Sequence, residues 1–212
     1  MGFANIKGLR LLKSEIEVLS MTGWFIPIGY PLGVLQSDDG DPSRDSMCVR
    51  IANDFQFMTP ASFDIWWQSR FFSEKELASW ALAHAISDFD EIIAGLIRNR
   101  LVVPQSNFTA EAFAKSHRLL PTAVGTGDDE GTGRYFVRDH NFEPLADLSL
   151  PTYLAWSLSD GSTGLWEACK KVASAVSLDA NHVLRELGTC VVDLIAVGAC
   201  VIDELVVNDA LV

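Results

Sequence analysis

The alternation of apolar and polar residues between positions 59 and 103 predicts three short helices followed by a strand. Thr59 is a suitable N-cap for a helix that starts at Pro60, because the N–H that proline lacks would be unpaired there. Ser73 and Glu76 have the spacing of a capping box, which predicts the start of a second helix. Its apolar face is expected to consist of Leu77, Trp80, Ala81 and His84.

The third helix of this stretch is predicted to begin after Asp88, with Glu91 three residues further on. Its apolar stripe consists of Ile92, Ile93, Leu96 and Ile97. Asn99 is a typical C-terminal stop. The apolar run from Leu101 to Val103 then predicts a strand, which Pro104 ends.

Strands are predicted before these helices as well. Residues 24–28 have a β-type composition and lead into the turn Gly29-Tyr30-Pro31, and residues 47–51 and 55–58 are also typical of strands. Further upstream, residues 4–19 carry apolar side chains at near-helical spacing, which predicts an N-terminal helix. The first half therefore contains two or three strands, three helices and a closing strand.

The same order of patterns starts again in the second half. Residues 31–40 align without gaps on residues 121–130, so that Pro31 falls on Pro121. An aromatic helix is predicted after Pro151, and a further helix carries Leu165, Cys169, Val172 and Val176. Asp179 is a suitable N-cap for a third helix, Gly198 is a typical stop, and residues 199–207 are β-type.

These patterns predict an α+β protein that consists of two repeated winged-helix-like units. The first unit spans residues 1–103 and includes the N-terminal helix, and the second spans residues 121–212. Residues 104–120 join them through a helix that Thr109 would cap. Four residues on the third helices are expected to be almost fully buried: Ile93, Leu96, Leu187 and Leu194.

The formal net charge of −12 argues against a nucleic-acid-binding protein. Contacts of Lys and Arg with phosphate supply most of the affinity of such proteins. Residues 31–103 contain six Lys and Arg against eleven Asp and Glu, and residues 121–212 contain five against fourteen. Both halves are acidic, so we expect no measurable binding to random duplex DNA at physiological salt.

The sequence contains no pattern typical of catalysis or metal binding. No nucleophile-elbow motif occurs, and the four histidines have no paired spacing, so His84 is expected to be a hydrogen-bonded core residue. The four cysteines lack CxxC spacing and are expected to act as small apolar residues. The acidic loop at residues 37–45 lacks the closing Glu of a calcium site, and residues 125–133 would repel phosphate. We expect no catalytic residue, metal or cofactor.

Two groups of residues are candidates for contact with a partner. Trp66 and Trp67 are neighbours on a predicted helix and therefore point about 100° apart, so both cannot face the core. One of them is expected at the interface between the units or in a binding groove. Lys170, Lys171 and Arg185 are the basic residues that would form a small positive patch on the helices of the second unit.

The segment Trp156-Ser-Leu-Ser-Asp-Gly-Ser162, which follows several strands and lies in an aromatic helix and its turn, resembles PqqD-like domains. These small domains recognise ribosomally made precursor peptides. The resemblance covers residues 121–202 and, less closely, residues 31–103. It implies a non-enzymatic domain that binds a peptide as an added strand beside the third helix. The long loops, the Arg70-Phe71-Phe72 segment in place of the Asp-Gly turn and the two units in one chain depart from that family.

We therefore expect a module that binds a peptide or protein and is not an enzyme. The alternative is a winged-helix transcriptional regulator that binds DNA through the second unit, whose third helix carries Arg185 near its start. No apolar run is long enough to cross a bilayer, and the N-terminus lacks the continuous apolar core of a signal peptide. A cytoplasmic protein without membrane contact is therefore expected, and a homodimer is left open.

Overall fold

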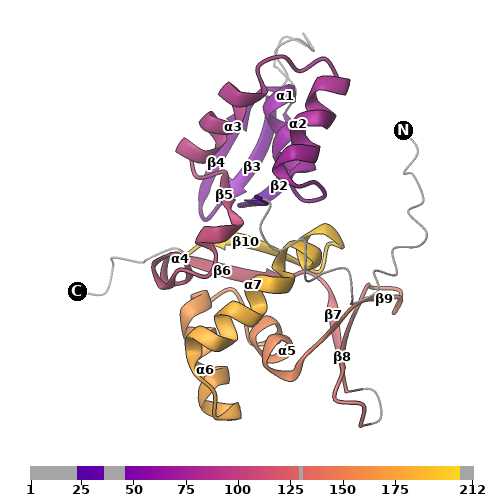
Figure 1. The fold of residues 1–212 in the computed structure, drawn as a ribbon, viewed down its shortest axis with the longest axis vertical. Helices are drawn as coiled ribbons and strands as arrows, with labels where there is room; N and C mark the ends of the chain where they lie inside the picture. Colours follow the sequence, from indigo (N-terminus) through magenta and orange to yellow (C-terminus); the bar gives the residue numbers. More distant parts are fainter. Residues whose placement is uncertain (1–22, 36–45, 129–130, 206–212) are drawn as a thin grey trace.

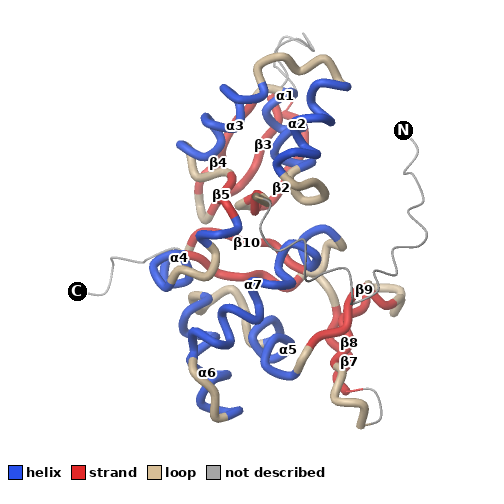
Figure 2. Tube along the Cα trace, in the orientation of Figure 1, coloured by secondary structure: helices blue, strands red, loops and turns tan. Residues whose placement is uncertain are grey.

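The computed structural model describes residues 23–35, 46–128 and 131–205, and its fold is α+β (Figure 1). The helix expected at residues 4–19 and the acidic loop at residues 37–45 lie outside the described residues. Figure 2 shows strands and helices mixed in both halves of the chain. Within the described residues, no helix has the length and apolar character required to span a bilayer.

The described residues of the first half form three helices and two small sheets. In chain order its elements are β1 (Phe25–Pro27), β2 (Tyr30–Leu35), β3 (Ser46–Ile51), β4 (Asp54–Met58), α1 (Pro60–Gln68), α2 (Glu74–Ala83), α3 (Phe89–Arg98) and β5 (Val102–Pro104). Strands β2, β3 and β4 form an antiparallel meander in that order, and β1 pairs antiparallel with β5. The first and last strands of this half are therefore neighbours.

The second half has its elements in the same order. They are β6 (His117–Pro121), β7 (Val124–Asp128), β8 (Tyr135–Arg138), β9 (Pro144–Leu148), α5 (Leu150–Ser157), α6 (Leu165–Val176), α7 (Ala180–Ala196) and β10 (Cys200–Glu204). Strands β7, β8 and β9 form a meander, and β6 pairs with β10. A 3₁₀ turn (Gln105–Asn107) and α4 (Glu111–Ser116) connect the two halves.

The helix starts follow the capping rules read from the sequence. Thr59 accepts a hydrogen bond from the Ser62 N–H at the start of α1, and Ser73 and Glu76 form a complete capping box at α2. Asp179 caps α7 through the Asn181 N–H. Asp88 precedes α3 as expected, but its side chain makes no capping hydrogen bond.

A tryptophan joins the first helix of each half to the closing strand of that half. The indole N–H of Trp66 donates to the carbonyl of Leu101 at 2.9 Å, and that of Trp156 donates to the carbonyl of Ala199 at 3.0 Å. Both indoles are buried, and a buried serine three residues later, Ser69 or Ser159, returns a hydrogen bond to the same helix. These contacts fix the helix against the strand because buried donors require partners.

The two halves share one continuous hydrophobic core. Ile28, just after β1, makes a parallel bridge to Ile202 in β10, and the Gly29 N–H donates to the Ile202 carbonyl at 2.7 Å. The buried carboxylate of Asp203 accepts from the Ala52 N–H in the first half and from Arg118 in the second, both at 2.7 Å. Figure 1 accordingly shows β10 and β6 lying between the two sets of helices.

The ungapped alignment of residues 31–40 on residues 121–130 is wrong by four positions. Pro31 lies in β2, whereas Pro121 lies in β6 and pairs with Cys200. The strands that occupy the same place are β2 and β7, where Tyr30 and Val124 stand opposite Arg50 and Arg138. Each of these strands has a bulge, which ends at Gly33 or Gly127; both glycines have a positive φ.

Three further expectations differ from the structure. The connecting helix was expected to extend to Leu120, but it ends at Ser116, because residues 117–121 pair with β10 as strand β6. Leu96, Leu187 and Leu194 are buried as expected, whereas Ile93, the fourth residue expected to be buried, is half-buried. His84 is exposed rather than part of the core, although its ring bonds to the Trp80 carbonyl and stacks on the Trp80 indole.

Candidate functional site

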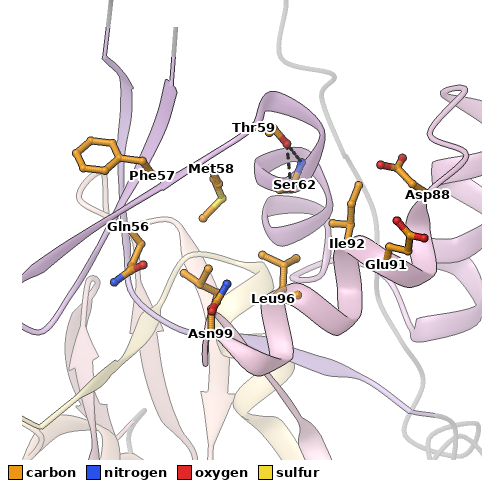
Figure 3. Close-up of a pocket in the computed structure, with 12 residues that line it drawn as sticks. Gln56, Phe57, Met58, Thr59, Ser62, Asp88, Glu91, Ile92, Leu96 and Asn99 are labelled. Carbon is orange, nitrogen blue, oxygen red and sulfur yellow. Dashed lines mark hydrogen bonds between the residues drawn. The ribbon is translucent and has the colours of Figure 1, made fainter. Parts of the chain in front are cut away.

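A groove of about 410 Å³ lies between strand β4 and helix α3 in the first half. Its β4 wall includes Gln56 and Met58, and its α3 wall includes Asp88, Glu91, Ile92 and Leu96. Figure 3 shows Asp88 and Glu91 at one end of the groove, Gln56 and Asn99 at the other, and Met58, Ile92 and Leu96 between them. The groove thus combines an apolar middle with polar ends.

One wall of the groove is a strand at the edge of its sheet. Within the described residues, β4 pairs with β3 alone, so one side of its backbone has no partner strand. An unpaired strand edge offers N–H and C=O groups to another extended chain. Side chains alternate along β4: Gln56 and Met58 are half-buried on the groove side, whereas Phe55 and Phe57 are 58% and 60% exposed.

The other wall is held in place by the core of the first half. Leu96 of α3 is only 3% exposed and contributes to the hydrophobic core, while Ile92 is half-buried. Just beyond α3, the Leu101 N–H donates to the Leu96 carbonyl at 2.8 Å, and the Leu101 carbonyl accepts from Trp66. The groove is therefore built from a fixed helix and from a strand edge that no other described strand pairs with.

The charges that line the groove are all negative. Asp88, the residue before α3, and Glu91, on the first turn of α3, are both exposed and lie three positions apart. None of the lining residues is a Lys or Arg, and neither carboxylate makes an ion pair with a cation of the described residues. The remaining polar groups are uncharged and include Gln56 and Asn99 at the far end.

A second groove, of about 390 Å³, lies at the same place in the second half, between β9 and α7. Its helix residues Glu186, Thr189 and Cys190 have the spacing of Asp88, Glu91 and Ile92. Ser149, the N-cap of α5, donates to Glu186 at 3.1 Å and so crosses this groove. In the first groove the hydroxyl of the N-cap Thr59 bonds to Ser62 at the start of α1, and no hydrogen bond between Thr59 and α3 is present among the described residues.

Further contacts engage the acidic side chains of the second groove. Arg134 forms an ion pair with Asp147 across β8 and β9, and the ring of His182 lies 3.1 Å from the second carboxylate oxygen of Glu186. Burial raises the pKa of the Cys190 thiol to about 12, so the thiol is neutral at physiological pH. The two grooves are alike in position but differ in the groups that remain free.

The tryptophans that the sequence analysis proposed as partner-binding residues lie outside both grooves. Trp66 is fully buried in the core of the first half. Trp67 is half-buried, stacks on Phe63, and carries the guanidinium of Arg70 at 4.0 Å from its ring centroid. Burial lowers the pKa of Arg70 to about 10, so Arg70 remains charged at physiological pH. The two neighbouring indoles thus differ in burial, although Trp67 also packs against the edge of the core.

The three basic candidates are exposed and also lie outside both grooves. Lys170 and Lys171 are on α6 and Arg185 is on α7. Lys170 forms an ion pair with Glu167 at 2.9 Å, which offsets its charge. The sequence analysis missed the groove residues instead. Their signal was the i, i+3, i+4, i+7 spacing of Asp88, Glu91, Ile92 and Gly95 beside the alternating strand 54–58.

The part of the chain that the structure describes holds no group of three or more His, Cys, Asp or Glu residues that could bind a metal ion. Burial raises the pKa of the thiols of Cys48, Cys169 and Cys200, which opposes a nucleophilic role. The buried His117 bonds through Nδ1 to the Phe113 carbonyl and to Ser116. Its environment is that of a packed core residue.

Comparison with known proteins gives no relative. No protein-family model, curated protein or solved structure matches the chain. The groove and the strand edge therefore carry the functional argument.

Proposed function

We propose that the protein is a peptide-binding module, and that the first half binds an extended peptide in the groove between β4 and α3. The peptide adds to the meander as a fourth strand next to β4. Main-chain hydrogen bonds to the strand edge give affinity, and contacts with α3 select alternate side chains of the peptide. The observation that supports this function is the edge of β4, which has no partner strand among the residues that the structure describes, beside an open groove of about 410 Å³.

The same proposal treats each half as a winged-helix-like unit, with the meander as the wing and α3 or α7 as the third helix. It is supported by the shared order of elements and by the matching strand pairs. The equivalent bonds of Trp66 and Trp156 and the equivalent bulges at Gly33 and Gly127 also support it. A strand added beside the third helix is also what the resemblance to PqqD-like domains implies.

DNA binding through the second half has less support. Lys170 is paired with Glu167, and α7 carries Glu186 one residue after Arg185. Too few free cations remain there to offset the repulsion from an acidic chain. Sub-micromolar binding of random duplex DNA at ~150 mM salt, abolished by Arg185→Glu, would favour the regulator over the peptide-binding module.

The experiment that tests the proposed function is selection of random heptapeptides displayed on phage against the full chain. Binders are then measured against a variant with a filled groove, Gly95→Trp. Gly95 lines the groove, and a Cβ at this position meets no atom within 4 Å, so the new side chain enters the groove without a clash at its root.

The matched control is Thr189→Trp, which places the same side chain in the groove of the second half. We expect peptides whose binding is lost in Gly95→Trp and retained in Thr189→Trp. Circular dichroism checks that both variants fold. Failure to enrich any peptide that depends on the first groove would overturn the proposed function.

A further inference from the structure

The charge and the length of the first groove limit the kind of ligand that fits it. Asp88 and Glu91 lie at one end of the groove, and the described residues of its lining include no Lys or Arg that could neutralise them. The apolar side chains of Met58, Ile92 and Leu96 follow, and uncharged amides close the other end. A ligand that matches this order carries positive charge at one end and an apolar side chain beside it.

We propose that the ligand of the first groove is an extended segment of about five residues in a partner protein, with a Lys or Arg at the Asp88–Glu91 end and an apolar residue next to it. This inference rests on the proposed function and specifies its ligand. Helix α3 rises about 1.5 Å per residue, so the eleven steps from Asp88 to Asn99 span roughly 16 Å. An extended chain covers that length in about five residues.

The groove of the second half does not offer the two carboxylates that would bind the basic residue of this ligand. Thr189 stands where the first groove has Glu91, so one carboxylate is absent. Glu186 stands where the first groove has Asp88, and its carboxylate is already bonded to Ser149 and to His182. A basic peptide therefore gains less there, and the second groove serves as an internal comparison for the first.

Two exposed carboxylates can give only a modest preference for a basic residue in the peptide. Exposed ion pairs contribute little individually, so replacing the basic residue of the peptide by Glu should weaken binding by roughly 3- to 10-fold at low salt. The difference should shrink as salt rises, because exposed charges are screened. The apolar contact and the strand hydrogen bonds should be insensitive to salt, so binding itself persists.

The test uses synthetic heptapeptides with the sequences of the library binders. They are made in pairs that carry either Lys or Glu at one position, and their binding to the full chain is measured by fluorescence anisotropy. We expect Lys and Arg to be enriched among groove-dependent binders, and the Lys peptide to bind more tightly. The double variant Asp88→Lys/Glu91→Lys should reverse the preference. The control, Asp64→Lys/Glu143→Lys, changes net charge equally at exposed residues outside both grooves and should keep it.

The outcomes separate this inference from the proposed function. Groove-dependent binders without a preference for basic residues, or with one that Asp88→Lys/Glu91→Lys leaves unchanged, would overturn the inference and leave the proposed function standing. The absence of any groove-dependent binder would overturn both. The chain's own basic residues Lys7, Arg10 and Lys13 supply a last test. If replacing them by Ser raises the affinity for the Lys peptide, the N-terminal segment competes for the groove, and the assignment to a separate partner is wrong.

Discussion

At the scale of single residues, a few buried polar groups determine how the helices sit on the strands. Trp66 is completely buried, yet its indole N–H reaches the carbonyls of Leu101 and Ile28, which belong to opposite ends of the first half. Leu101 follows α3, and its N–H donates to the carbonyl of Leu96 in that helix. The indole therefore links the core to the wall of the candidate groove.

Trp66→Phe should lower the free energy of unfolding by roughly 2–3 kcal/mol. The smaller ring leaves a void, and the two carbonyls lose a donor that buried groups need. Urea denaturation measures the change. Trp67→Phe is the control, because Trp67 is half-buried and makes no indole hydrogen bond among those described, so its cost should stay near ~1 kcal/mol. Equal effects of the two substitutions would contradict this role of Trp66.

His117 makes stability depend on pH. Burial is the largest effect on its ring and lowers its pKa, while the hydrogen bond to the Phe113 carbonyl and the nearby Glu204 oppose that shift. A histidine whose pKa falls on folding binds protons more readily in the unfolded chain. Stability from this residue is therefore fully present above the unfolded pKa of ~6.5 and is lost as pH falls through the folded pKa.

We accordingly expect urea denaturation at pH 5.5 to give a lower free energy of unfolding than at pH 7.5. The difference should be smaller in His117→Phe, whose ring keeps the stacking on Phe113 but cannot take up a proton. A variant with the same or a larger pH dependence would show that His117 is not the group responsible.

At the scale of elements, local signals predicted the helix starts well, but they did not predict strands whose partners are distant in the sequence. Caps at Thr59, Ser73 and Asp179 act within four residues, so the sequence contains the whole interaction. Residues 117–120 were assigned to a helix because their partner strand, β10, lies about 80 residues away along the chain. Tertiary pairing decided their conformation.

The candidate groove was missed for the same reason. That β4 is an edge strand depends on the order of strands in the sheet, and that α3 lies beside it depends on the packing of the first half. The sequence gives the alternation in residues 54–58 and the helical stripe of Asp88, Glu91 and Ile92, but not their proximity. The register of the second half was missed because the alignment placed Pro31 of β2 on Pro121, which pairs with β10 as part of β6, whereas β2 matches β7 four positions further along.

A comparison of Ser73, which caps a helix, with Thr109, which does not, tests the effect of capping on stability. Ser73→Ala should cost about 1 kcal/mol of stability, because the capping box of α2 loses its acceptor. Thr109→Ala should cost less than ~0.5 kcal/mol. Thr109 was expected to cap the connecting helix, but that helix starts after Ala110 without a side-chain cap. Chemical denaturation of both variants measures the difference, and a larger loss for Thr109→Ala would contradict it.

At the scale of the whole molecule, the two halves are joined by backbone pairing and by the buried carboxylate of Asp203. The Asp203 side chain is 2% exposed, lies 2.7 Å from Arg118, and also accepts from Ala52 of the first half. Arg118 donates further to the Gly161 carbonyl at 2.8 Å. The bond from Ala52 to Asp203 ties the first half to the second, and the bonds of Arg118 hold Asp203 in place within the second half.

Asp203→Asn should lower the free energy of unfolding by ~3 kcal/mol, because it leaves the guanidinium of Arg118 without its counter-charge in a largely buried place. The control is Glu204→Gln, which removes a long 3.8 Å contact with the exposed Arg100 and should cost less than ~1 kcal/mol. Thermal denaturation followed by circular dichroism compares the two. Similar melting temperatures for Asp203→Asn and the parent chain would contradict the junction described here.

The central claim is that a peptide adds to the edge of β4 and that the matching edge of β9 stays free. Backbone amide hydrogen exchange tests it most directly, measured with and without a saturating amount of a groove-dependent heptapeptide. The account predicts slower exchange in residues 54–58 and in α3, with unchanged exchange in residues 144–148. Unchanged exchange in residues 54–58, or protection of residues 144–148 instead, would contradict it.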